Sequence, residues 1–321
     1  MKKKALRKDF YMEIRRSLGR FLSIFFIVAI GCAFFAGIRS SEPDMRYSGD
    51  QYFDWTNLMD LQVISTMGLT DEDLDAIEEI DGVSAVEGGY STDVLCTEGD
   101  NQVVMHVMSL LPSMNQMQME DGRLPKNEKE CVVDARFLER SSLKIGDEIQ
   151  IFSGTEDLIT DTLKNDTFTI VGSVSSPCYI SFQRGSTTIG DGSIKGFIGV
   201  EEEVFDLDVY TEIYAQVEGA KELTVFTDAY DECVNEVMDR VEAIKEEREN
   251  ARYDGIVSEA QEKLDDAKQK VKDAEEELAQ GKADADKKLS DARKKLEDAQ
   301  KELDSGKNAL QASMAQLASS R

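Results

Sequence analysis

Few residues of this chain are of the types that carry out chemistry, and they do not lie at the spacings that chemistry requires. The single histidine, His106, lies in the apolar run 103–108 with no partner at ligand spacing, so it fits a structural strand residue better than a zinc ligand or a triad base. Residues 71–82 begin like a calcium loop, but Ala76 stands at the sixth position and Gly82 at the twelfth. This motif therefore fails.

A second calcium-type loop and a phosphate loop fail as well. Residues 191–202 have the glycine and the final glutamate of a calcium loop, but Lys195 occupies a ligand position. The stretch 185–190 is followed by Asp191 where a phosphate loop needs lysine. We expect no catalytic residue, no cofactor and no metal ion, and an ectoenzyme is the least favoured class because no nucleophile and base occur together.

The cysteines indicate neither a zinc module nor a disulfide scaffold, because the chain contains no CxxC pair. Four of them follow the long apolar segment described below, namely Cys96, Cys131, Cys178 and Cys233. Four cysteines can pair in three ways, but their sparse spacing favours thiols.

The charges divide the chain of 321 residues into three different segments. Residues 1–40 carry nine basic and two acidic side chains, residues 41–255 carry fifteen and 47, and residues 256–321 carry thirteen and fifteen. The formal net charge of −27 excludes nucleic acid as an expected partner, because binding to phosphates requires clustered basic residues.

Residues 21–38 form an uncharged apolar stretch that is long enough to cross a bilayer as a helix. Basic residues precede it and the chain after Arg39 turns acidic, so the positive-inside rule places the N-terminus in the cytoplasm. We therefore expect a plasma-membrane protein whose residues after about 40 are extracytoplasmic. A cleaved signal peptide is the alternative, but its apolar region is shorter and ends in an A-x-A-like site.

Residues 1–20 combine basic side chains with an apolar stripe at helical spacing. This pattern predicts an interfacial helix, or elbow, that lies on the inner face of the membrane and contacts a cytoplasmic partner. Arg15 and Arg16 are the candidate contact residues. A basic flank that only retains the span in the membrane is the alternative.

After a linker at 39–57, residues 58–227 predict an acidic α+β domain. Strands at 58–65 and 83–96 enclose a helix at 70–80, capped by Thr70 with Asp73, which gives a βαβ unit. A turn at 98–101 then predicts a hairpin with a strand at 101–111. Further strands are expected at 130–133, 147–152, 166–174, 196–200 and 212–218, with short helices at 134–140 and 201–206. Residues 185–192 predict a mobile loop between two lobes.

Residues 228–321 lack proline and are rich in Ala, Glu, Lys and Leu, which is typical of a long helix or coiled coil. Apolar residues recur every seventh position in two runs, and alanines occupy the intervening core positions. This seam comprises Leu264, Val271, Leu278, Leu289, Leu296, Leu303, Leu310 and Leu317. The step of eleven residues between the runs predicts local unwinding near Gly281. A solitary charged helix is the alternative.

The order of these segments resembles the FtsX/MacB-type permease family of ABC transporters. The resemblance covers residues 1 to about 245 and rests on the segments Asp9–Phe10, Ile14–Leu22, Met119–Pro125, Glu130–Asp134 and Leu143–Ile149. In that family a "GR.P" turn, a short strand, a small helix and an "lkiGD.i" strand entry recur in the external domain. The resemblance implies a separate cytoplasmic ATPase as partner, and a permease that moves substrates or controls envelope proteins.

Two functions are therefore expected. In the first, the chain is the N-terminal part of an ABC permease subunit, whose elbow and span couple an ATPase to the external domain and coiled-coil arm. Its partners are the ATPase, the remaining permease transmembrane segments, the lipid bilayer and an envelope or cell-wall protein at the coil. The missing part is expected to begin with a return helix and a strand that completes the external domain. In the second, the chain is a single-span membrane-anchored scaffold without an ATPase.

Overall fold

The computed structural model describes residues 2–98, 101–155 and 158–319. The chain divides into two compact units, Met1–Arg252 and Tyr253–Arg321. The first contains all the strands described below, and the second consists of the greater part of the long helix α5 (Asp228–Ser319).

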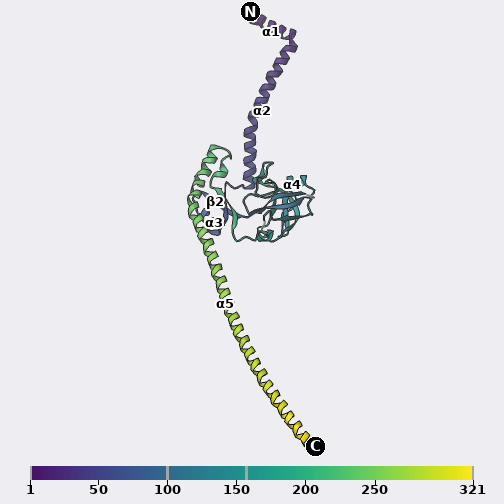
Figure 1. Ribbon diagram of the computed structural model, residues 1–321. Coiled ribbons are helices and arrows are strands. Elements are labelled where there is room, and N and C mark those ends of the chain that lie inside the picture. The colour runs from purple at the N-terminus through teal and green to yellow at the C-terminus, as the bar shows by residue number, and fades with distance from the viewer. Residues whose placement is uncertain (1, 99–100, 156–157, 320–321) are drawn as a thin grey trace. The chain divides into compact units, whose positions relative to one another are not determined.

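The N-terminal region consists of two helices, α1 (Lys2–Arg16) and α2 (Leu18–Thr56), which meet at Ser17 (Figure 1). The Ser17 hydroxyl donates a hydrogen bond of 2.9 Å to the Glu13 carbonyl, a local bond that competes with regular helix. The sequence analysis expects a linker at 39–57. In the structure α2 continues through this segment as far as Thr56, so these residues are helical. Only Pro43 interrupts the helical hydrogen bonding there.

The smaller sheet has the order β1-β10-β2, from β1 (Leu61–Leu69), β10 (Tyr210–Val217) and β2 (Val83–Gly89). Helix α3 (Asp71–Glu78) connects β1 to β2, and its predicted capping box between Thr70 and Asp73 is present. Because β10 pairs antiparallel with both β1 and β2, the expected βαβ unit is split by an inserted strand. The two strands of the unit run parallel without touching.

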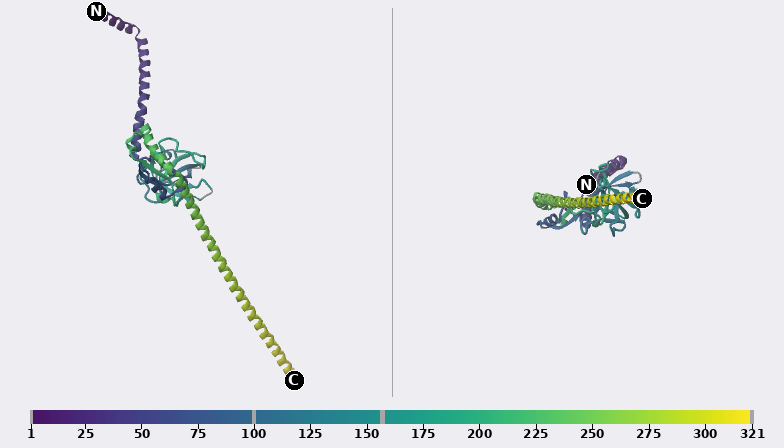
Figure 2. Two further views of the ribbon diagram at one scale, coloured as in Figure 1. Left: turned by 90° about the vertical axis from the view of Figure 1, so that its left-hand side faces the viewer. Right: turned by 60° about the horizontal axis from the view of Figure 1, so that its bottom comes forward.

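The first part of α5 packs on this smaller sheet, as both Figure 1 and Figure 2 show. Val237 of α5 is buried against Val217, and Ile244 packs against Ile213 of the same strand. The predicted boundary at 227/228 therefore divides elements that pack together, since the compact unit extends to Arg252.

In the described part of the chain, the larger sheet has seven strands in the order β5-β8-β6-β9-β4-β3-β7. Strand β7 also pairs with β8, so the sheet closes on itself and leaves β5 as an appended strand. The strands are β3 (Ser91–Glu98), β4 (Asn101–Ser109), β5 (Gln118–Gly122), β6 (Glu130–Asp134), β7 (Glu148–Phe152), β8 (Thr167–Ser175) and β9 (Ile194–Val200).

Among the described residues, one short α-helix and three 3-10 turns follow strands of the larger sheet: α4 (Ala135–Arg140), Ile159–Asp161, Pro177–Tyr179 and Glu202–Val204. A further 3-10 turn, Ala220–Glu222, follows β10 of the smaller sheet. The interior of the closed sheet is apolar, because side chains from all its walls meet there. It includes the fully buried residues Val94, Met105, Ile151, Leu163, Ile170 and Ile198.

The α+β class is confirmed, and most expected strands lie within a few residues of their predicted positions. The strand expected at 83–96 is divided at Tyr90, so its halves belong to different sheets. Strands β3 and β4 form the expected antiparallel hairpin, although residues 99–100 of its turn lie outside the described residues. The loop 185–192 does not separate two lobes: its Ile189 is buried against Val104 of the larger sheet.

The turn after β5 requires a glycine. Gly122 has φ +81°, and a Cβ there would lie 2.4 Å from the Val171 carbonyl oxygen. The following residue, Arg123, forms a two-point ion pair with Glu130 at 2.6 and 2.7 Å. Its guanidinium lowers the pKa of the Glu130 carboxyl to about 2. The turn thus joins β5 to the start of β6.

Gly122→Ala should lower the free energy of unfolding by about 3 kcal/mol, because it adds a steric clash to an unfavourable backbone angle. Gly219→Ala is the matched control, since Gly219 has φ +80° and open space around it, and should cost about 1 kcal/mol. Urea unfolding of the detergent-solubilised chain, followed by circular dichroism, compares the two. Equal losses would contradict the close approach at Gly122.

Candidate functional site

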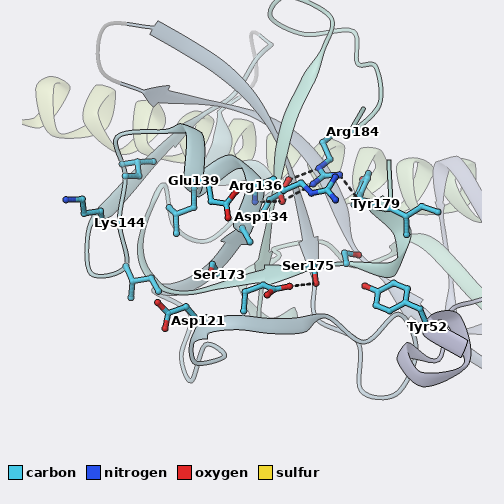
Figure 3. A pocket seen from close by; sticks show the side chains of 17 residues that line it. Tyr52, Asp121, Asp134, Arg136, Glu139, Lys144, Ser173, Ser175, Tyr179 and Arg184 are labelled. Atoms are coloured by element: carbon cyan, nitrogen blue, oxygen red, sulfur yellow. Dashed lines mark hydrogen bonds and ion pairs between the residues drawn. The ribbon is translucent and has the colours of Figure 1, made fainter. Parts of the chain in front are cut away.

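A pocket lies between β5, β8, α4 and the end of α2 and has a volume of about 1010 Å³ (Figure 3). Lys144 and Tyr52 lie at opposite ends of it, and Asp134 and Arg184 form part of its wall. The charged side chains around it are of both signs, for example the acidic Glu120 and Glu139 and the basic Lys144. This mixture does not select one charged ligand.

An ion pair between Asp134 and Arg184 is the most buried charged contact in the described part of the chain. The Arg184 Nε lies 2.6 Å from one carboxylate oxygen of Asp134, and its Nη2 lies 3.0 Å from the other. Arg184 is 7% exposed and Asp134 is 1% exposed. Each charge must therefore be balanced by protein groups and not by water. The remaining Nη1 donates to the Tyr179 and Ser181 carbonyls.

This ion pair fixes the loop after β8 to the start of α4. Asp134 is the N-cap of α4, since its carboxylate accepts a hydrogen bond of 3.1 Å from the Arg136 amide. Arg136 in turn lies over the ring of Phe182, 4.6 Å from its centroid. The hydrogen-bonding groups of the pair are thus engaged in contacts within the fold.

Glu212 of β10 is another buried charged residue, and it joins the two sheets. Its carboxylate accepts hydrogen bonds from Gln62 of β1 at 2.6 Å, from the hydroxyl of Ser91 of β3, and from the Tyr214 hydroxyl. Burial and the neighbouring Glu212 charge raise the pKa of the Tyr214 hydroxyl. Tyr214 therefore stays a neutral donor, and Glu212 connects strands of both sheets.

His106 is held on the larger sheet by its cross-strand neighbour. It pairs with Asp93 in the β3–β4 register, and its Nδ1 lies 2.7 Å from the Asp93 carboxylate. Burial acts to raise the pKa of the Asp93 carboxyl. Hydrogen bonds from His106 and Thr187, together with the electrostatic attraction of His106, outweigh this effect and hold the pKa below its ordinary value. This geometry agrees with a structural strand histidine. Among the described residues, no group of three metal-ligating side chains occurs.

The end of α2 is fastened to segments from both sheets. Asn57 ends the helix in the left-handed conformation at φ 53°, and its side-chain amide donates a hydrogen bond of 3.0 Å to the Ser113 carbonyl. The Gln116 amide donates 2.8 Å to the carbonyl of Thr56, which is fully buried. We call these contacts, together with those of the next paragraph, the α2 junction.

On its other side the α2 junction holds the segment that leads into α5. The Val225 amide donates a hydrogen bond of 2.8 Å to the Asp50 carboxylate, and Arg46 donates one of 2.6 Å to the Phe226 carbonyl. The rings of Phe53 and Phe226 meet at 6.3 Å between centroids. One helix end therefore contacts the loop after β4 and the start of α5 together.

Before this junction, α2 has the properties of a membrane span. It is the one described helix that is long and apolar enough to cross a membrane, with a mean hydropathy of 2.6 in its most apolar window and none of that window buried. Phe34 and Phe35 are each 70% exposed, which suits lipid contact and not water. Helix α1 precedes the span, and its Arg15 and Arg16 are exposed.

The second unit is a single helix whose apolar seam has no partner in the described part of the chain. Its seam residues are between 50% and 74% exposed: Leu264, Val271, Leu278, Leu289, Leu296, Leu303 and Leu310. The side chain of Leu317 lies outside the described residues. The seam residues lie on one continuous helix, as predicted, and pairing of the seam stays a prediction.

The residues that the sequence reading missed are the buried polar ones, above all Arg184 and Glu212. Asp134 had a usable signal, because it directly precedes the helix expected at 134–140 and is a favoured N-cap residue. Arg184 lies in a loop and Glu212 at the start of an expected strand, and no local pattern marks either as buried.

Comparison with known proteins agrees with this architecture. The family described as MacB-like periplasmic core domain matches residues 18–231. A comparison with curated proteins finds no match.

Among solved structures, the extracellular domain of the noncanonic ABC-type transporter YknZ from Gram-positive bacteria is 11% identical, with a TM-score of 0.32, over 49% of this chain and 78% of that chain. The periplasmic region of MacB from Actinobacillus actinomycetemcomitans is 12% identical, with a TM-score of 0.30, over 59% and 85%.

The match over residues 18–231 shows that the chain belongs to the MacB-like periplasmic core domain family. It therefore contains the extracytoplasmic core domain of a MacB/FtsX-like ABC transporter permease. This domain is a non-catalytic part of a permease.

Arg184→Met should destabilise the first unit by about 3–5 kcal/mol, because it leaves the Asp134 carboxylate buried and unpaired. Adding Asp134→Asn in the same chain should recover more than half of this loss. Arg240→Met is the control, since its contacts with Glu236 and Asp81 are exposed and should contribute about 1 kcal/mol. Thermal unfolding of the three variants measures the difference; an Arg184→Met chain as stable as Arg240→Met would refute the assigned burial.

Proposed function

We propose that this chain is the N-terminal part of an ABC permease subunit and couples a separate cytoplasmic ATPase to the external core domain and coiled-coil arm, for export of a substrate or control of envelope proteins. The α2 junction carries this proposal, because one continuous helix joins the apolar segment to loops from both sheets. A displacement of α2 at the membrane acts directly on the loop after β4 and on the start of α5.

The orientation follows from charge. Basic residues precede the apolar segment and acidic residues dominate after it, so the N-terminus lies in the cytoplasm and residues after about 40 lie outside. Helix α1 then lies on the inner membrane face, separated from the span by the break at Ser17. That position exposes Arg15 and Arg16 to a cytoplasmic ATPase, and the remaining permease transmembrane segments and the lipid surround the span.

The coil supplies a second contact. A leucine at every seventh position is not needed by a solitary solvated helix, so the exposed seam supports pairing with a partner helix. An envelope or cell-wall protein at the coil is the proposed partner. The external domain and coil then act as a lever or docking arm.

A single-span scaffold without an ATPase is the alternative, supported by the exposed seam, which can pair the chain with a partner helix. Affinity purification of the protein from its native membrane, with mass spectrometry of its partners, separates the two. A co-purifying ABC ATPase supports the permease. Recovery of the chain with only itself or an envelope protein would replace the permease with the scaffold.

Arg15→Glu with Arg16→Glu should lower the amount of co-purifying ATPase by roughly tenfold, a loss of about 1.4 kcal/mol, because it reverses the charge of the elbow. Lys3→Glu with Arg7→Glu makes the same charge change nearer the N-terminus and controls for membrane insertion and orientation. Equal ATPase recovery from both double variants would reject Arg15 and Arg16 as contact residues.

Leu296→Glu with Leu303→Glu should abolish pairing of the coil and leave the first unit folded, because both leucines lie on the seam beyond Arg252. Lys294→Glu with Lys301→Glu adds two carboxylates at the same heptad spacing off the seam, and should retain pairing. Cross-linking between paired helices in membranes measures the outcome. Unchanged cross-linking in the leucine variant would disprove the seam.

A further inference from the structure

A small pocket beside α4 is lined mainly by basic side chains. It has a volume of about 280 Å³ and lies between α4, the start of β9 and the loop after β8. Its charged lining residues, among those described, are Arg136, Arg140, Arg184, Lys195 and the acidic Asp134. Residues 41–255 carry fifteen basic and 47 acidic side chains, so four of the fifteen basic side chains surround this one pocket.

The acidic lining residue does not neutralise this positive charge. The Asp134 carboxylate is already paired with Arg184, at 2.6 and 3.0 Å (Figure 3). In the described part of the chain, neither Arg136 nor Arg140 has a carboxylate within ion-pair distance. Two arginines of a strongly acidic domain therefore face a pocket without a carboxylate of the described residues to balance them.

The positive charges lie close together on two elements. Arg136 and Arg140 are four residues apart on α4, and like charges at this spacing repel each other. Lys195 of β9 adds a third charge from another element. Its ion pair with Asp191, at 2.8 Å, is exposed to water and therefore weak. An anion in the pocket would offset the charges of all three side chains.

An exposed aromatic ring stands beside these charges. Phe182 lines the pocket and is 76% exposed, and the Arg136 guanidinium lies over its ring, 4.6 Å from the centroid. This cation–π contact holds the guanidinium in place and leaves much of the ring in contact with water. Two residues further along, the buried ion pair of Arg184 fixes the loop that carries Phe182. The ring thus offers an apolar surface next to an anion site.

Three cations around a small space select a compact anion with several acceptor oxygens. A phosphate monoester carries about −1.5 to −2 charges near pH 7 and three strong acceptor oxygens. Guanidinium groups bind such oxygens through paired hydrogen bonds, and a lysine adds a point charge. A carboxylate has only two oxygens and a single charge. The pocket of about 280 Å³ admits a phosphate with a small organic group.

We propose that this pocket binds a phosphate monoester, with Arg136, Arg140 and Lys195 as donors to the phosphate oxygens. The ring of Phe182 contacts the organic group of the ester. Arg184 takes no direct part, because its guanidinium is engaged with Asp134 and with backbone carbonyls. The proposal concerns the external domain alone and does not depend on coupling to an ATPase.

The test is calorimetric titration of the full chain, in an uncharged detergent at low salt, with glycerol phosphate. Arg136→Gln with Arg140→Gln should weaken binding by about tenfold or more, because it removes two charge-assisted donors. Lys126→Gln with Lys129→Gln is the matched control: it removes two charges from exposed positions before β6 and should leave the affinity unchanged. All four side chains are exposed, so both double variants should fold, which circular dichroism checks.

Two further probes identify the source of the phosphate. Tighter binding of dihexanoyl phosphatidic acid than of glycerol phosphate supports a lipid headgroup, and the reverse order supports a water-soluble ester. Phe182→Ala should weaken binding of both esters but not of inorganic phosphate.

Any of three results overturns the proposal. The first is that neither ester binds, and the second is equal affinity of the two double variants for glycerol phosphate. The third is that inorganic phosphate binds as tightly as both esters and Phe182→Ala has no effect.

Discussion

The structure of the first unit depends on how α2 ends. A helix that leaves an apolar environment must end its backbone hydrogen bonding and still keep contact with the domain that follows. Asn57 does both, because its left-handed conformation stops the helix while its side chain bonds to Ser113. With Asp50 holding Val225, the last two turns of α2 are tied to segments distant in sequence. The helix end is thus a fixed point for the strands around it.

A fixed point transmits a displacement only if the body behind it is stiff. Two buried polar contacts join separate elements of this body. Glu212 links β1, β3 and β10, and Asp134 with Arg184 locks the loop after β8 onto α4. Buried carboxylates are costly unless fully paired, so these contacts favour one arrangement over near alternatives.

How much the sequence could predict depended on how local each signal was. The capping box at Thr70 and the strand positions follow from short patterns, and both were predicted. Strand β5 was missed because its residues are polar and mostly exposed, so neither apolar alternation nor β-propensity marks it. The helix across 39–56 was read as a linker because its charged residues and Pro43 interrupt the apolar pattern. Closure of the larger sheet and the contact between Arg184 and Asp134 each join residues far apart in sequence. A single sequence carries no local pattern that predicts such contacts.

In the part of the chain that the structure describes, the edge of β1 and the heptad seam have no pairing partner. A water-soluble protein that works alone protects such surfaces with charge, because open edges and apolar stripes promote aggregation. This chain surrounds both with charged residues yet leaves Met238 and Leu296 exposed within them. The charge keeps the surfaces soluble and the apolar residues keep them competent to pair.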